Sequence, residues 1–124
     1  MATGVERKIE IEYFNVVNGG NPKGGDSLPA TATLIVKINE ERKSATANGG
    51  CSVDAIVKAM RLATGIEFDV KNPEIHTASN GDGVHSVAKL LGYYKDVKYY
   101  GTGHGMNENE ALVYGCLDIV NQIQ

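Results

Sequence analysis

Residues 49–60 of the chain read GGCSVDAIVKAM, and this stretch decides the fold. Ser52 belongs to the residue types that cap helix N-termini. The apolar residues after it recur at the spacing of one helical face: Val53, Ile56, Val57 and Met60. Gly65 is the residue type that most often ends a helix. The stretch therefore predicts a glycine-rich turn followed by a helix from Ser52, its N-cap, to Gly65.

The same order of elements occurs twice in the chain. Residues 31–47 alternate in polarity as two strands that turn at 39–41, and they lead into this helix. Residues 84–91 and 97–102 repeat that pattern, with a turn at 92–96 between them. A second glycine-rich stretch, 101–105, then precedes a helix from Asn107 to Ile123, where Asn107 and Glu110 resemble a capping box. The sequence thus contains an internal repeat of about fifty residues.

One further strand precedes each copy. Residues 8–17 alternate, with Ile9, Ile11 and Tyr13 on one face, and residues 66–79 form an edge or interrupted strand broken at Asn72-Pro73. We therefore expect an α+β fold of two similar strand-rich units, a βββα-like repeat with its helices packed on antiparallel sheet. The units span about 8–65 and 66–124 of a single domain, 8–124, after a flexible N-terminus at 1–7. Residues 18–28, rich in glycine, are expected to form a mobile loop.

Composition excludes several classes of function. The twelve Lys and Arg are scattered among fifteen acidic residues, so the chain lacks the basic field of a nucleic-acid-binding protein. No apolar run is long enough for a membrane span, and the N-terminus lacks a signal-peptide pattern. We expect a cytoplasmic protein in which Cys51 and Cys116, at corresponding ends of the two helices, are free thiols.

The sequence contains no clear catalytic, metal or cofactor motif. The glycines at 101–105 differ in spacing from a dinucleotide fingerprint and precede two glutamates, so turn glycines are the simpler interpretation. His76, His85 and His104 lack metal-ligand spacing. Cys51 at a helix start could act as a nucleophile with one of these histidines, but no oriented base or oxyanion hole is visible. We therefore predict no catalytic residue, no metal and no cofactor.

Residues 29–36 and 49–56 together resemble the C-terminal regulatory domain of the 2-isopropylmalate synthase and citramalate synthase family. That family has a Pro-x-Ala-x-Val-type strand and then Gly-Asn-Gly-Pro-Val-Asp-Ala at the start of a helix. The similarity continues through residues 76–83 and 100–103, and it covers Tyr13 to Ile123.

The resemblance implies a regulatory domain rather than an enzyme. Such domains form dimers, bind leucine or isoleucine and inhibit the catalytic barrel of an acyl-CoA-condensing synthase. The barrel itself is not part of these residues, so the resemblance implies an excised domain or a free-standing relative. The effector-binding residues that it implies are Gly50, Ser52, Val53, Val70, Glu74, Thr77 and Val84.

These residues suit an amino acid chemically. Backbone N–H groups at a helix start can bind its carboxylate, Glu74 its ammonium, and short aliphatic groups its side chain. The sequence does not rank leucine above isoleucine. Two alternatives stay open: a structural dimerisation module without an effector, and a nucleotide-binding domain that uses the later glycine stretch.

Overall fold

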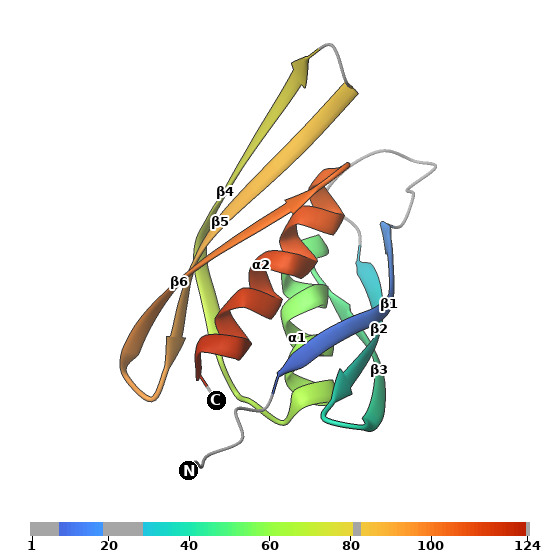
Figure 1. Ribbon diagram of the computed structural model, residues 1–124, viewed down its shortest axis with the longest axis vertical. Coiled ribbons are helices and arrows are strands. Elements are labelled where there is room, and N and C mark those ends of the chain that lie inside the picture. Colours follow the sequence, from blue (N-terminus) through green and yellow to red (C-terminus); the bar gives the residue numbers. More distant parts are fainter. Residues whose placement is uncertain (1–7, 19–28, 81–82, 124) are drawn as a thin grey trace.

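The chain folds as two successive βββα units, which confirms the predicted α+β repeat (Figure 1). The structure, a computed structural model, describes residues 8–18, 29–80 and 83–123. The first unit comprises β1 (Ile9–Asn18), β2 (Ala30–Ile38), β3 (Glu41–Gly49) and α1 (Ser52–Thr64); the second comprises β4 (Asp69–Asn80), β5 (Gly83–Tyr94), β6 (Val97–Gly105) and α2 (Glu108–Ile123). The predicted flexible N-terminus, and the predicted loop beyond Asn18, lie outside the described residues.

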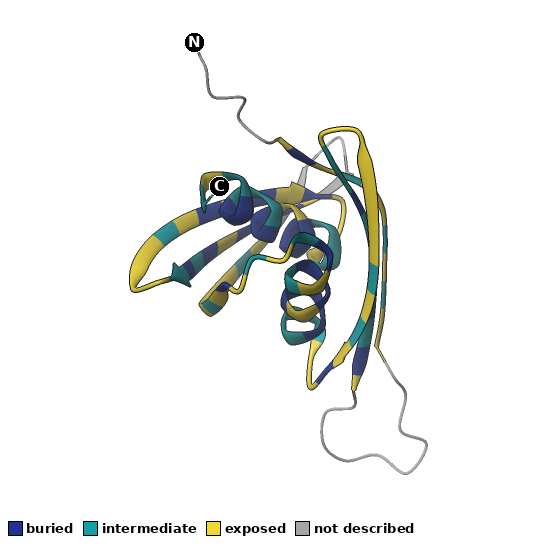
Figure 2. Cartoon of the chain, turned by 90° about the horizontal axis from the view of Figure 1, so that it is seen from below, coloured by how far each residue is buried: buried dark blue, intermediate teal, exposed yellow. Residues whose placement is uncertain are grey.

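Each unit contributes one antiparallel sheet and one helix. The first sheet, sheet A, has the order β1-β2-β3, and the second, sheet B, has the order β4-β5-β6. Helix α1 packs on β2 and β3, α2 packs on β5 and β6, and the two helices contact each other. Figure 1 shows both helices between the two sheets. Figure 2 shows buried residues on the helices and on the strands that they pack against. One core therefore joins the two units.

The repeat is visible in which residues face that core. On the central strands, Ala32 and Leu34 of β2 occupy the positions that Ala88 and Leu90 hold on β5, and all four are buried.

The turn after β5 is shorter than the predicted 92–96, because β5 continues to Tyr94 and only Lys95 and Asp96 turn, both with positive φ. The equivalent turn in the first unit is at Asn39 and Glu40.

The glycines at 101–105 do not form a turn, contrary to the prediction. Gly101, Gly103 and Gly105 lie in β6, with their missing side chains toward α2. A Cβ at Gly101 would lie 2.7 Å from the backbone O of Gly115, and one at Gly103 would clash with the backbone of α2 at Ala111 and Gly115. The glycine run therefore allows a helix to lie directly on the strand.

The alternation along β1 changes phase at a bulge between Ile11 and Tyr13. Ile9 and Ile11 face the core as expected, but after the bulge Phe14 and Val16 pack against it while Tyr13 is 49% exposed. The prediction that Tyr13 shares a face with Ile11 is therefore wrong. The extra residue at the bulge reverses which side of the strand each later residue occupies.

Strand β4 lies at the edge of sheet B, as Pro73 predicted. It runs without a break from Asp69 to Asn80, but its pairing with β5 is irregular between Lys71 and Glu74. Asn72, at φ 50°, is part of this irregularity. An edge position tolerates both features, because one side of the strand needs no ladder partner.

The two helices begin differently. The N-cap of α1 is Cys51 rather than the predicted Ser52, and its side chain makes no capping hydrogen bond. At α2, the backbone N of Glu110 donates to Asn107 Oδ1 at 2.9 Å, and Glu110 Oε1 accepts from the backbone N of Met106 at 2.6 Å. The capping prediction for α2 is thus confirmed in its essentials, since both side chains bind backbone N–H groups at the helix start.

The two cysteines are free thiols, as predicted, but they do not lie at corresponding ends of the helices. Cys51 is the exposed N-cap of α1, whereas Cys116 is buried within α2. In the repeat, Cys116 occupies the position in α2 that Met60 occupies in α1, and both side chains are buried in the core.

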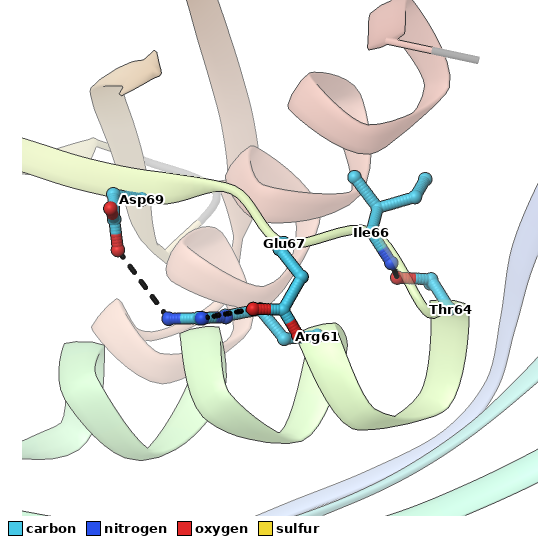
Figure 3. Close-up of polar contacts among 5 residues, drawn as sticks. All are labelled: Arg61, Thr64, Ile66, Glu67 and Asp69. Carbon is cyan, nitrogen blue, oxygen red and sulfur yellow. Dashed lines mark hydrogen bonds and ion pairs between the residues drawn. The ribbon is translucent and has the colours of Figure 1, made fainter. Parts of the chain in front are cut away.

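Polar contacts fix the connection between the units (Figure 3). Gly65 ends α1 in the left-handed conformation, as predicted, and donates to the carbonyl of Arg61 at 2.8 Å. Arg61 forms ion pairs with Glu67 at 2.7 Å and Asp69 at 3.5 Å. Thr64 Oγ1 accepts from the backbone N of Ile66 at 3.2 Å. The last turn of α1 thereby sets where β4 begins.

Candidate functional site

A cleft of about 820 Å³ lies where both helices begin. It is lined by the end of β1, by the first residues of α1 and α2, and by one residue of β4. These are Phe14, Asn15, Val16, Asn18, Gly50, Cys51, Ser52, Val53, Ile75, Asn107, Glu108, Asn109 and Leu112. Both units of the repeat therefore contribute to one site.

The start of α1 leaves backbone donors available in this cleft. The first N–H groups of a helix have no partner within it, and Cys51 supplies no side-chain cap. The Ser52 hydroxyl donates to Asn18 Oδ1, another group of the cleft lining, at 2.9 Å. An anionic group in the cleft would thus meet N–H groups that no side chain in the described part of the chain caps, and the positive end of the α1 dipole.

Asp54 does not cancel this field, because its carboxylate is already engaged. Asp54 Oδ2 accepts from the backbone N of Gly50 at 3.0 Å and lies 3.1 Å from Lys58 Nζ. The bond from Gly50, reinforced by Lys58, lowers the pKa of Asp54. Its negative charge is therefore shared with a backbone donor and a cation outside the cleft lining.

Glu108 is the one carboxylate among the described residues that line the cleft. It is exposed in the first turn of α2, a position that the helix dipole favours for an acid. The neighbouring acid Glu110 is bonded to Met106 instead. Glu108 is thus placed to bind a cationic group of a ligand.

The remaining lining includes apolar side chains from four elements. Phe14, Val16, Val53 and Ile75 are half-buried against the core, and Leu112 is buried. Together with the N–H groups and Glu108, they give the cleft an anion-binding end, a cation-binding group and an apolar wall. That combination matches the three parts of an aliphatic α-amino acid.

Three of the sequence-predicted effector residues line this cleft: Gly50, Ser52 and Val53. The other four do not. Val70 packs at the edge of the core, Thr77 Oγ1 lies 3.1 Å from the hydroxyl of Ser86, and Val84 pairs with Ser79 in the β4–β5 hairpin. Glu74 is exposed, pairs in register with Lys89 and is next to Ile75 on β4, so it lies on the opposite face of the strand from the cleft.

Sequence reasoning missed Phe14, Ile75 and Glu108. The repeat itself contained the signal for Glu108, because it makes the start of α2 equivalent to the start of α1. Phe14 could not be assigned to the cleft, since its orientation depends on the bulge in β1. Ile75 lines the cleft because an edge strand of the second unit reaches the first, which no local pattern encodes.

A catalytic pair at Cys51 finds no support in this geometry. Cys51 lines the cleft, but none of the described lining residues is a histidine. Within the described ranges, no group of three or more His, Cys, Asp or Glu residues is arranged to hold a metal ion. No helix in the described part of the chain has the length and apolar character that crossing a membrane requires.

Comparison with known proteins agrees with the resemblance seen in the sequence. The 2-isopropylmalate synthase of Aeromonas hydrophila is 25% identical over 115 residues, and that of Erwinia tasmaniensis is 28% identical over 120 residues. These alignments cover 93% and 95% of this chain but only 21% and 22% of the relatives, so the chain spans about a fifth of their length.

The family comparison covers all of the residues. A model of the LeuA allosteric (dimerisation) domain matches residues 1–124. The two βββα units described above are therefore the two halves of a regulatory domain, and the chain belongs to the LeuA allosteric (dimerisation) domain family.

Proposed function

We propose that the chain binds a branched-chain amino acid, leucine or isoleucine, in the cleft between the helix starts. It would do so as a homodimer that regulates the catalytic domain of an acyl-CoA-condensing synthase of the 2-isopropylmalate or citramalate type. Its location in the cytoplasm stays a prediction from the sequence.

The observation that carries this proposal is the composition of the cleft. The backbone N–H groups of Ser52 and Val53, in the first turn of α1, suit the effector carboxylate, and Glu108 suits its ammonium. Phe14, Val53 and Leu112 suit a branched aliphatic side chain. In this arrangement Glu108 takes the role that sequence reasoning gave to Glu74.

The position of the cleft suggests how binding could be transmitted. Its lining comes from α1 and β1 of the first unit and from α2 and β4 of the second. A ligand held by both helix starts would favour one relative placement of the two units over others. A change in that placement is a signal that a domain docked on either sheet could sense.

A second copy of the chain is the expected dimer partner. The family is named for dimerisation, and the outward faces of the sheets carry exposed apolar residues such as Val17 on sheet A and Tyr100, 72% exposed, on sheet B. Light scattering should give twice the chain mass at micromolar concentration. A monomer under those conditions would contradict the dimer.

The structure affects the two alternative functions from the sequence analysis differently. A nucleotide site at residues 101–105 loses its basis, because the backbone and side chains of α2 occupy the space beside those glycines. A structural dimerisation module without an effector remains the competing function.

Thermal unfolding with single amino acids added distinguishes these functions. An effector at a hundred times its dissociation constant adds about 2.7 kcal/mol to the stability of the folded state. We expect leucine or isoleucine to raise the melting temperature and alanine and ATP to leave it unchanged. If neither leucine nor isoleucine raises it, the chain is a structural module, and a rise with ATP alone would restore the nucleotide alternative.

A further inference from the structure

The three histidines of the chain gather on the face of sheet B that is turned away from α2. On β5, Ser86 and Ala88 are buried, whereas His85, the residue before Ser86 and therefore on the opposite face, is exposed. His76 on β4 and His104 on β6 both pair in register with Val87. The three histidines therefore lie around Val87 on one outer surface. None of these four residues lines the cleft described above.

Two of these imidazoles are in direct contact. His85 Nε2 lies 3.0 Å from His104 Nδ1, with ring centroids 5.2 Å apart and planes at 33°. The two residues come from adjacent antiparallel strands and are diagonal neighbours on the same face. The ladder fixes their backbones, so the spacing of the two nitrogens depends only on the side-chain torsions.

That spacing suits a shared metal ion. Ligand nitrogens about 2.1 Å from an ion, and at right angles to each other around it, are about 3.0 Å apart. Imidazole pairs at such cis positions are typical of tetragonal Cu²⁺ and Ni²⁺ sites. We propose that His85 Nε2 and His104 Nδ1 chelate a divalent transition-metal ion on the outer face of sheet B.

Metal binding by the two imidazoles requires no added acid or base. The hydrogen bond between the rings requires a proton on one of the two facing nitrogens and a lone pair on the other. When the ion binds, that proton moves to the other nitrogen of the same ring through solvent, and both facing nitrogens become ligands. Both side chains are exposed, so both rings are free to turn until their lone pairs point toward one ion, and water completes the coordination shell.

His76 is not a third ligand in this arrangement. Val87 lies between it and His104 in the register, and the three histidines do not form a group that could hold an ion together. The next row on this face carries charged side chains, since Lys89 pairs there with Glu74 and Thr102. A site of two protein ligands should therefore bind more weakly than a closed structural site.

Calorimetric titration with Ni²⁺ alone tests the proposal on the full chain. We expect one site per chain in the wild type and a loss of affinity on the order of a hundredfold in His85→Gln and in His104→Gln, because each removes one arm of a chelate. His76→Gln is the matched control, with the same residue type on the same exposed face, and should bind as the wild type does. Circular dichroism should show unchanged folding in all three variants.

Each other result would overturn the assignment. Equal affinity of the wild type and His85→Gln would place any bound Ni²⁺ elsewhere, and no binding by the wild type would remove the site. An equal loss in His76→Gln would exclude the two-ligand geometry. Effector binding in the cleft is independent of these outcomes, because none of the three histidines lines it.

Discussion

The side-chain amide of Asn121 on α2 binds both backbone polar groups of Ile9 on β1. Ile9 N donates to Asn121 Oδ1 at 2.8 Å, and Asn121 Nδ2 donates to Ile9 O at 3.0 Å. β1 is an edge strand of sheet A, so the amide acts there as a neighbouring strand would. The end of the second unit is thereby bound to the beginning of the first.

Replacing Asn121 with Ala should destabilise the fold by at least about 2 kcal/mol, because it leaves two partly buried backbone groups of a core residue unpaired. Urea denaturation at fixed protein concentration measures the change. Gln122→Ala is the control, since Gln122 donates to the exposed carbonyl of Tyr100 at 2.7 Å, where water can take its place. Equal losses in the two variants would contradict a special role for Asn121.

Gly103 should not tolerate even a methyl group. A Cβ there would overlap the backbone of α2 at Ala111 and Gly115, so Gly103→Ala must move the helix off the strand. We expect a loss of at least about 3 kcal/mol in the free energy of unfolding. Gly50→Ala provides the comparison, because a Cβ at Gly50 meets nothing within 4 Å, and its stability should change by no more than about 0.5 kcal/mol.

Cys116 should be unreactive while the protein is folded. Burial raises the pKa of its thiol to about 12, so the thiolate is scarce at pH 8 and the side chain is also inaccessible. A thiol reagent should therefore titrate only Cys51, which is exposed, and should titrate both cysteines in denaturant. In Cys51→Ser the folded protein should give no fast reaction, and a fast reaction there would show that Cys116 is accessible.

Local sequence patterns predicted most of the fold. The alternation on β2 and β5 and the apolar faces of α1 and α2 identified the elements and the repeat, because each reflects which side of an element meets the core. The predictions that failed were those that depend on contacts between elements. Gly103 was assigned to a turn because the approach of α2 to β6 is not encoded near Gly103. Tyr13 was assigned to the same face as Ile9 and Ile11 because a bulge leaves no local signature.

The candidate site was predicted only where it lies on one continuous segment. Gly50, Ser52 and Val53 lie together at the start of α1, so a local motif locates them. Glu108 and Ile75 join them only through the packing of the second unit on the first. Their place in the cleft is a property of tertiary structure, and sequence order gives no access to it.

Effector binding should depend on Val53. Val53 lines the cleft one residue into α1, whereas Ile56 and Met60 on the same helix are buried in the core. An aspartate at this position would repel the effector carboxylate and remove an apolar contact, yet it would favour the helix dipole by a few tenths of a kcal/mol. Val53→Asp should therefore abolish binding of leucine or isoleucine and leave the helix content unchanged.

Two further variants separate this site from a general effect of charge on α1. Leu62→Asp adds the same group near the other end of the helix, where the side chain is 67% exposed and lies outside the cleft lining, and it should bind as the wild type does. Glu108→Gln removes the proposed partner of the ammonium and should weaken binding by roughly tenfold or more, the loss expected for a charge-assisted hydrogen bond. Calorimetry measures all three variants, with circular dichroism as the folding control. Undiminished binding by Val53→Asp would move the effector out of this cleft, even if the wild type binds leucine tightly.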